Sequence, residues 1–293
     1  MRRFLLVLTL LIAGLAAFAL WMTRAAPLTA ADLPALSGDA QAGRAIFLAA
    51  GCATCHASRD TAGEARPTLS GGRRLSTAYG TFVAPNISPD PAHGIGGYDF
   101  AGLVSVLRLG VSPDGQHLFP VMPYTSYARM SLQDIADLKA WLDELPASDA
   151  PDRPHELALP RSLRQGIGLW KERYLDPGFI GAAPSAQVER GRYLVEGPGH
   201  CAECHTPRDR FGGLERHRWM AGGDGLAAQA PNITPAALGW SREEIVWYLE
   251  SGHGPDGARA SHGMEEILAG LGQLPRTDLE AIATYLKGLA PVR

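Results

Sequence analysis

The 293-residue sequence has few cysteines, no excess of basic residues and no sustained alternation of polar and apolar residues. Its 27 lysines and arginines face 30 aspartates and glutamates, which gives a formal net charge of −3. This balance, together with the lack of any Lys/Arg-rich run, excludes a basic nucleic-acid-binding surface. Four cysteines are too few for a disulfide scaffold. Because no stretch alternates with a period of two, we expect a helical protein with almost no sheet.

Familiar catalytic patterns are also missing. The sequence has no recognisable Ser/His/Asp set, no phosphate-binding glycine loop and no paired-carboxylate motif. The 34 glycines and 22 prolines indicate long, loop-rich connections between helices.

One long apolar run stands at the N-terminus. Residues Phe4 to Met22 carry no charge over 19 positions, between Arg2-Arg3 and Arg24. About 20 apolar residues span a bilayer, whereas the apolar region of a cleaved signal has about 7–15. We therefore predict an uncleaved membrane anchor over residues 1–24. A signal cleaved after Ala17-Phe18-Ala19 and a buried core helix are the alternatives.

The anchor fixes the expected location of the rest of the chain. Basic residues at the N-terminus stay in the cytoplasm, so the chain after Arg24 would be exported to the bacterial periplasm and held at the inner membrane. Without its three flanking arginines the exported part has 24 basic and 30 acidic residues, a net charge of −6.

Every cysteine belongs to a C-x-x-C-H motif. The two motifs are Cys52-Ala53-Thr54-Cys55-His56 and Cys201-Ala202-Glu203-Cys204-His205. Two thiols one helical turn apart can form thioethers with the haem vinyl groups, and the following histidine can reach the iron. Zinc binding would need further ligands at suitable spacing, and a redox C-x-x-C would need a thioredoxin-like context. We predict two covalently bound haem c groups, with His56 and His205 as proximal iron ligands.

The sequence around the motifs is an internal repeat. Segments that match between the two halves are Gly43-Arg44 with Gly191-Arg192, Ala84–Ser88 with Ala230–Thr234, Gly110–Gly115 with Gly252–Gly257, and Met122 with Met264. We predict one haem domain over residues 35–148 and a second over 184–293, joined by a linker over 149–183.

Each half is expected to contain three main helices. The expected ranges are 39–50, 100–109 and 132–145 in the first half, and 186–196, 242–249 and 278–289 in the second. Ser131 and Thr277 are the expected N-caps of the last helix in each half.

These motifs, together with the P-N-I-[ST]-P segments and Ser112-Pro113-Asp114-Gly115 leading to Met122-Pro123-Tyr124, resemble diheme and triheme c-type cytochromes. In that family such proteins are electron-transfer subunits of membrane-bound bacterial alcohol, aldehyde and gluconate dehydrogenases. The resemblance implies two tandem class I cytochrome c domains, all-α in fold, with His and Met axial ligands. The third haem motif of the triheme members is missing here.

The distal ligand of each haem is expected to be a methionine. Met264 is the expected sixth ligand of the second haem, with His253 and His262 as competitors, whereas Met220 is expected in packing. For the first haem, the repeat offset favours Met122 and the family pattern favours Met130. Both stay open.

The Pro-Asn-Ile turns and the linker lead to two further predictions. The asparagines of the two Pro-Asn-Ile turns, at 86 and 232, are expected to bond either a loop backbone or a haem propionate. In the linker, Leu163, Ile167, Trp170 and Tyr174 recur at helical spacing beside basic residues. This predicts an amphipathic helix that lies either on the membrane or between the two haem domains.

The function expected from these features is electron transfer. The chain would accept single electrons from a periplasmic dehydrogenase and pass them to quinone, a terminal oxidase or another cytochrome. The alternative is an enzyme, such as a diheme peroxidase or a thiosulfate dehydrogenase. A peroxidase needs an open iron position, and thiosulfate-oxidising enzymes typically use a cysteine ligand, for which no spare cysteine exists.

Overall fold

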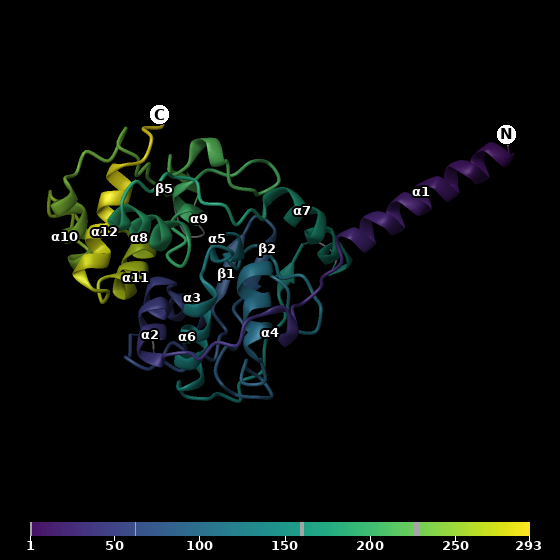
Figure 1. The fold of residues 1–293 in the computed structure, drawn as a ribbon, viewed down its shortest axis with the longest axis horizontal. Helices are drawn as coiled ribbons and strands as arrows, with labels where there is room; N and C mark the ends of the chain where they lie inside the picture. The colour runs from purple at the N-terminus through teal and green to yellow at the C-terminus, as the bar shows by residue number, and fades with distance from the viewer. Residues whose placement is uncertain (1, 62, 159–160, 225–228) are drawn as a thin grey trace.

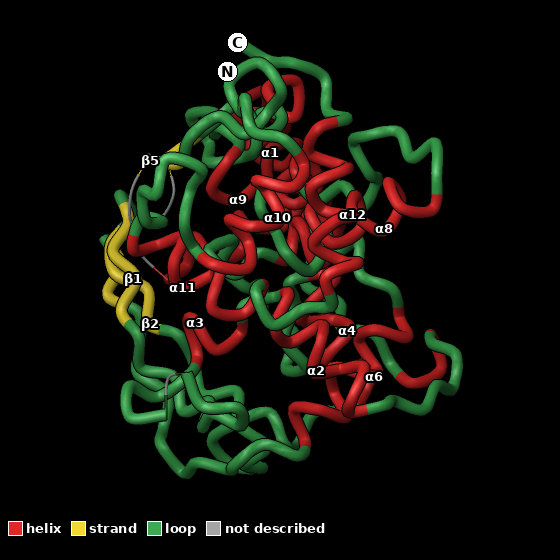
Figure 2. Tube along the Cα trace, turned by 90° about the vertical axis from the view of Figure 1, so that its left-hand side faces the viewer, coloured by secondary structure: helices red, strands yellow, loops and turns green. Residues whose placement is uncertain are grey.

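The computed structural model describes residues 2–61, 63–158, 161–224 and 229–293. One long helix, α1 (Arg2–Met22), projects from a helical body in which two groups of helices lie beside one another (Figure 1). The body is mostly helix and loop, and its few short strands lie at one side (Figure 2).

The first group of helices follows a short 3₁₀ turn, η1 (Ala30–Asp32). Its members are α2 (Ala40–Ala49), α3 (Cys52–His56), α4 (Phe100–Val104), which continues as the π-helical turn η2 (Ser105–Leu109), α5 (Tyr124–Tyr127) and α6 (Leu132–Asp143). We call residues 35–148 the first repeat. The three helices predicted there are confirmed.

The second group repeats this order between residues 184 and 293, here called the second repeat. Its members are α8 (Ala186–Glu196), α9 (Ala202–His205), η4 (Arg216–Arg218), α10 (Arg242–Ser251), α11 (His262–Leu271) and α12 (Arg276–Lys287). The three helices predicted there are also confirmed. The last one starts two residues earlier than expected.

Helix caps account for these boundaries. The Ser131 hydroxyl accepts a hydrogen bond from the Asp134 amide, which confirms it as the N-cap of α6. The prediction for Thr277 is wrong, because α12 begins at Arg276 and Pro275 occupies the N-cap position. Proline has no amide hydrogen and a fixed φ, so it is well suited to the start of a helix.

The first and last helices of each repeat cross closely at a glycine. An added Cβ on Gly43 of α2 would overlap the Asp137 carbonyl of α6, and one on Gly191 of α8 would overlap the Ala281 carbonyl of α12. Glycine therefore allows the two backbones to touch.

A separate apolar cluster fills each repeat. The first includes Phe47, Leu103, Ile135 and Trp141, and the second includes Val195, Ile245, Leu279 and Tyr285. Each cluster buries the apolar faces of helices from its own repeat, although Leu48 and Ala49 of the first repeat also reach the second cluster. Burial of these faces from water is what stabilises helices of about ten residues.

Short strands occur where almost no sheet was expected. Strands β1 (Arg74–Thr77), β2 (Gly80–Val83) and β3 (Glu156–Leu157) form an antiparallel sheet, and β4 (Gly223–Asp224) pairs with β5 (Gln229–Ala230). Strands of two to four residues are too short to produce an alternating pattern that can be recognised.

The linker contains η3 (Arg161–Gly166) and α7 (Ile167–Tyr174), which confirms a helix in this segment. Ile167 is buried, and the Trp170 ring packs edge-on against Tyr124 of the first repeat, with ring centroids 6.4 Å apart. The side chain of Leu163 lies outside the described residues. Helix α7 therefore packs on the body while one of its faces stays exposed.

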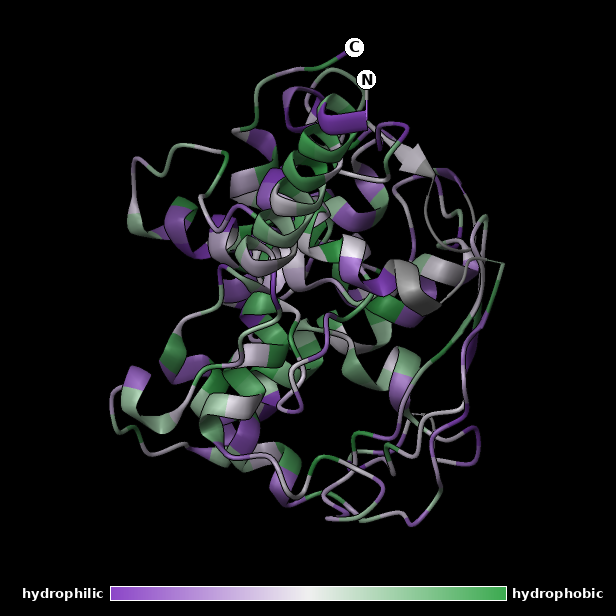
Figure 3. Ribbon diagram, turned by 90° about the vertical axis from the view of Figure 1, so that its right-hand side faces the viewer, coloured by the Kyte–Doolittle hydropathy of each residue, from purple (hydrophilic) through white to green (hydrophobic). Residues whose placement is uncertain are grey.

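Helix α1 projects from the body and does not pack against it over residues Arg2–Ala19. None of the 18-residue window Arg2–Ala19 is buried, and its length and composition are sufficient to cross a membrane. Figure 3 shows it as a largely hydrophobic helix with hydrophilic residues at its start. The alternative of a buried core helix is therefore wrong, while a membrane span and a signal sequence both fit.

Candidate haem sites

Both C-x-x-C-H motifs lie on a single short turn of helix. In α3, Cys52 and Cys55 are three residues apart and therefore share one face of the helix. In the second motif Cys201 immediately precedes α9, which contains Cys204. The thiols of Cys52, Cys55 and Cys201 are free.

The histidine that ends each motif is oriented in the same way in both repeats. The Nδ1 atom of His56 lies 2.8 Å from the Pro85 carbonyl oxygen, and that of His205 lies 2.8 Å from the Pro231 carbonyl oxygen. With Nδ1–H donating to a carbonyl, Nε2 is the unprotonated nitrogen and can bind a metal. Sequence reasoning did not identify this role for the prolines, although both belong to the repeated Pro-Asn-Ile segment.

The asparagine that follows each proline bonds the same turn to another part of the backbone. Asn86 donates to the Ser148 and Ala150 carbonyls, and Asn232 donates to the Val292 carbonyl. The expectation of a bond to loop backbone is therefore confirmed for both. Each turn connects the proximal histidine to the chain that follows the last helix of its repeat.

Burial changes the titration of the motif residues. Loss of water raises the pKa of the Cys52 and Cys201 thiols to about 12 each. Burial also lowers the pKa of His56 and His205, so both imidazoles are neutral at pH 7. A neutral imidazole is the form that binds iron.

These donor sets fit haem c. Each site offers two thiols on one helical face and a neutral imidazole whose second nitrogen is already held by a carbonyl. Among the described residues, no group of three or more His, Cys, Asp or Glu side chains forms another metal-binding cluster.

The methionine candidates lie in equivalent loops of the two repeats. The Leu118 amide donates to the Gly110 carbonyl at 2.7 Å, as the Ala260 amide does to the Gly252 carbonyl at 2.8 Å. Met122 and Met264 each follow this contact by four residues, which supports the predicted repeat offset.

The other candidate, Met130, immediately precedes the N-cap of α6, where the second repeat has Leu274 before α12. Its side chain is fully buried in the first apolar cluster, against which Met122 also packs. Met264 packs against the second cluster.

Met220 occupies a structural position in the second repeat. It is fully buried, and its carbonyl accepts from the Ile233 amide, as that of Leu69 accepts from the Ile87 amide in the first repeat. An apolar residue fills this position in both repeats, in agreement with the expected packing role.

The two repeats contact each other through their motifs in a reciprocal manner. Thr54, inside the first motif, bonds to the Glu266 carbonyl of α11 at 3.4 Å. Glu203 occupies the same motif position in the second repeat and accepts from Thr125 and Ser126 of α5 at 2.7 and 2.9 Å. The first motif therefore touches the helix that contains Met264, and the second touches the short helix that lies between Met122 and Met130 in the chain.

The thiols of the two motifs also lie close together. Burial raises the pKa of Cys55, Arg73 lowers it, and the nearby Glu266 and Cys204 raise it further. Cys204 belongs to the second motif and Cys55 to the first. The electrostatic interaction between them agrees with the reciprocal bonds of Thr54 and Glu203, which bring both motifs to the contact between the repeats.

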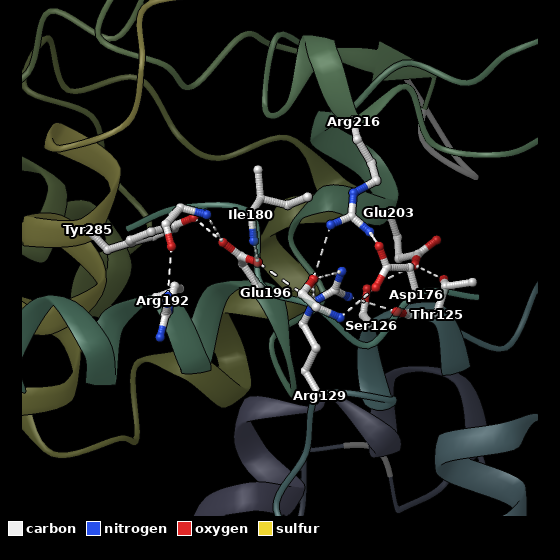
Figure 4. A network of polar contacts seen from close by, with 12 residues as sticks. Thr125, Ser126, Arg129, Asp176, Ile180, Arg192, Glu196, Glu203, Arg216 and Tyr285 are labelled. Atoms are coloured by element: carbon white, nitrogen blue, oxygen red, sulfur yellow. Dashed lines mark hydrogen bonds and ion pairs between the residues drawn. The ribbon is translucent and has the colours of Figure 1, made fainter. Parts of the chain in front are cut away.

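A polar network also joins the two repeats (Figure 4). Fully buried Glu196 of α8 accepts from the Ile180 and Gly181 amides at 2.7 and 3.1 Å and from the Tyr285 hydroxyl. The guanidinium of Arg129, in the first repeat, lies 3.7 Å from the same carboxylate. One carboxylate therefore connects the linker to both repeats.

Comparison with known proteins agrees with this arrangement. The cytochrome c family model matches residues 40–146. A protein of Cereibacter sphaeroides described as a diheme cytochrome c-type protein is 51% identical over 280 residues, which are 94% of each chain. The chain therefore belongs to the c-type cytochrome family.

Within this family, the chain is also similar to cytochrome subunits of dehydrogenases. The fructose dehydrogenase cytochrome subunit of Gluconobacter japonicus is 35% identical over 84% of this chain and 52% of its own length. The gluconate 2-dehydrogenase cytochrome c subunit of Pantoea cypripedii is 33% identical over 86% of this chain and 60% of its own length. The chain spans about half the length of such subunits.

Proposed function

We propose that the chain is a membrane-anchored diheme cytochrome c that relays single electrons from a dehydrogenase partner to quinone, a terminal oxidase or another cytochrome. The observation that carries this proposal is the pair of equivalent C-x-x-C-H motifs, each of which contacts the opposite repeat in a reciprocal manner. Covalently bound haem supplies an iron centre that gains and loses one electron at a time.

The residues of the chain hold this centre in a defined way. In the first repeat, Cys52 and Cys55 would form the thioethers and His56 would bind the iron through Nε2, and Cys201, Cys204 and His205 would do the same in the second. Met264 would complete the second site. In the first site either Met122 or Met130 would do so, and a thioether ligand raises the potential relative to two histidines.

The apolar helix α1 supports the membrane part of the proposal. Its exposed apolar surface needs a lipid environment or removal by a signal peptidase. We infer that it stays in the inner membrane with the body in the periplasm. Carbonate-washed membranes should then retain the full-length chain, whereas a mature protein beginning near Leu20 would show that the segment is cleaved.

The number of haems can be tested by removing one attachment site. Replacing Cys201 and Cys204 together with serine should leave one haem that survives acid–acetone extraction, attached to the first repeat. The same replacement of Cys52 and Cys55 is the matched control and should leave one on the second. Two retained haems in either variant would contradict the assignment.

The relay itself is tested by reduction kinetics. Purified haem-loaded protein should be reduced in stopped-flow mixing by a dehydrogenase with its substrate. The rate should depend on ionic strength, because the exported part carries a net charge of −6. Rapid turnover of peroxide or thiosulfate by the cytochrome alone would instead support the enzyme alternative.

A further inference from the structure

The residue that follows α1 is held against the body by several contacts. Thr23, the residue after α1, is buried, and its carbonyl accepts from Nε2 of His117 at 2.8 Å. Gly168 of α7 packs directly on Thr23, where an added Cβ would overlap the Thr23 carbonyl. Nδ1 of His117 accepts from Nζ of Lys171 at 3.0 Å, and Lys171 also donates to the Gly110 carbonyl at 2.6 Å. Helix α1, helix α7 and the first repeat therefore meet in one set of contacts around Thr23.

An exposed surface adjoins this junction. Leu169 follows Gly168 in α7 and is 58% exposed. Nε1 of Trp170 donates to the Phe211 carbonyl at 2.9 Å and so holds the 209–213 turn against α7, with the Phe211 ring 55% exposed. We call Leu169, Arg173, Arg210 and Phe211 the α7 patch.

The composition of the α7 patch matches a lipid headgroup region. The Arg210 guanidinium lies over the Phe211 ring at 4.7 Å, and Arg173 lies over Tyr174 at 5.4 Å. Aromatic residues and arginines gather at membrane interfaces, where the rings enter the acyl boundary and the charges meet anionic lipid. The patch carries two exposed arginines, although exposed Glu172 lies beside Arg173 on α7. These two arginines can pair with anionic lipid headgroups even though the net charge of the exported part is acidic.

We propose that the α7 patch rests on the membrane surface, so that the body stands on the bilayer in one fixed orientation with its second repeat directed away. The proposal rests on membrane anchoring by α1. If α1 crosses the bilayer, its last residue lies at the membrane surface, and α7 contacts the residue that follows. In Figure 1, α7 lies beside the end of α1, and α10 lies at the opposite end of the body.

Thiol accessibility in vesicles tests this orientation. In the haem-loaded protein the native cysteines are used for attachment, so one introduced cysteine is a unique label site. Full-length Leu169→Cys and Phe211→Cys are reconstituted in vesicles of phosphatidylcholine and phosphatidylglycerol and treated with a membrane-impermeant maleimide. The matched control is Trp247→Cys on α10, where the native side chain is also 55% exposed. Thiols at 169 and 211 should react several-fold more slowly than the thiol at 247.

A fourth variant separates this inference from the anchoring on which it depends. Leu11→Cys lies in the middle of α1 and should be fully protected. If it is protected while positions 169 and 211 react as fast as 247, the orientation proposal is overturned and anchoring stands. If position 11 reacts as fast as 247, anchoring itself fails. Protection at 169 and 211 that requires an added dehydrogenase would show a protein-binding surface instead and overturn the bilayer assignment.

The junction is tested by combining Gly168→Val with Phe211→Cys. The larger side chain should displace α7 from Thr23, so the thiol at 211 should lose its protection while the haem absorbance stays unchanged. Unaltered protection would contradict a role for the junction in orientation.

Discussion

Glu196 is a buried carboxylate on which three parts of the chain converge. It receives two backbone amides of the linker, the Tyr285 hydroxyl and the Arg129 guanidinium. A buried charge is tolerable only when such partners replace water. Its removal would leave two buried amides without an acceptor and the Arg129 guanidinium, which also donates to the Thr125 and Gly178 carbonyls, without its buried carboxylate partner.

We therefore expect Glu196→Ala to lower the free energy of unfolding by about 3–5 kcal/mol. Guanidinium unfolding of the full chain in detergent, followed by circular dichroism, measures this loss. The control is Glu250→Ala, whose partner Arg276 lies 2.8 Å away on the surface. This control should lower the free energy of unfolding by less than about 1 kcal/mol, because exposed ion pairs contribute little to stability. Equal losses in the two variants would contradict the role given to Glu196.

The distal ligands give a second prediction for single residues. If both irons have the proposed methionine ligands, Met264→Ala should remove about half of the near-infrared sulfur-to-iron absorption, because one of the two irons would lose its thioether. Met122→Ala and Met130→Ala are then compared. Only the variant that removes the ligand of the first iron should lose the remaining sulfur-to-iron absorption and allow carbon monoxide to bind. If neither does so, the first iron has a ligand other than methionine.

The attachment residues and proximal histidines could be proposed from the sequence alone, because covalent chemistry requires adjacent positions in the chain. It could not choose between Met122 and Met130, since distal ligands approach through a long loop whose path depends on packing. The Pro85 and Pro231 carbonyls were missed for a related reason. Any residue has a carbonyl, so its identity does not reveal the bond.

Among the helices, the crossing of α8 with α12 depends on one glycine. Alanine normally stabilises a helix by about 0.5–1 kcal/mol relative to glycine. At Gly191 a methyl group would overlap the Ala281 carbonyl, so we expect Gly191→Ala to destabilise the protein by about 1–3 kcal/mol. Gly239→Ala is the control, because an added Cβ there meets nothing within 4 Å. Thermal unfolding that leaves both variants at the wild-type midpoint would contradict a tight crossing.

The junction of α1 with α7 should depend on pH. Burial lowers the pKa of His117 from 6.5, and neighbouring Lys171 and Arg164 lower it further, although the Thr23 carbonyl opposes them. The folded state therefore prefers neutral His117. The contribution of His117 to the free energy of unfolding is complete above pH 6.5, and it is lost as the pH falls towards the lowered pKa. Protonated Nδ1 also cannot accept from Lys171.

Hydrogen exchange of the α7 amides, corrected for intrinsic rates, measures this effect. Protection of α7 should decrease between about pH 7 and pH 5, while α12 serves as the internal control. The variant His117→Gln should lose the pH dependence. Equal changes in α7 and α12 would point to general acid destabilisation instead.

Helix positions were predictable because each helix buries one face at the 3.6-residue period and its copy appears in the other half. The short strands were not, since two to four residues carry no readable period. The error at Thr277 has a local origin: two acceptable starting residues lie close together, and Pro275 takes the N-cap.

At the scale of the whole molecule, the two repeats meet as near-equivalent partners. The same motif position, Thr54 in one repeat and Glu203 in the other, contacts α11 and α5 respectively. Such a contact resembles the self-complementary interface of a two-fold dimer. Matching segments in the two halves of the sequence predicted the repeat, but the contact between the two copies depends on surface residues that differ between them.

The ion pair of Arg73 with Glu266 joins the two repeats through two hydrogen bonds, and it supplies the last prediction. Both Arg73 terminal nitrogens bond the Glu266 carboxylate, at 3.0 and 2.8 Å, and one also donates to the Thr54 carbonyl at 2.6 Å. Glu266→Lys would place two cations together, so the repeats should separate and intramolecular electron exchange between the two haems should slow several-fold. Flash reduction followed at the two haem absorbances measures this rate. Glu265→Lys, which changes a neighbouring exposed carboxylate paired with Arg259, is the matched control and should exchange at the wild-type rate. If both variants exchange equally fast, the Arg73 contact does not set the spacing of the haems.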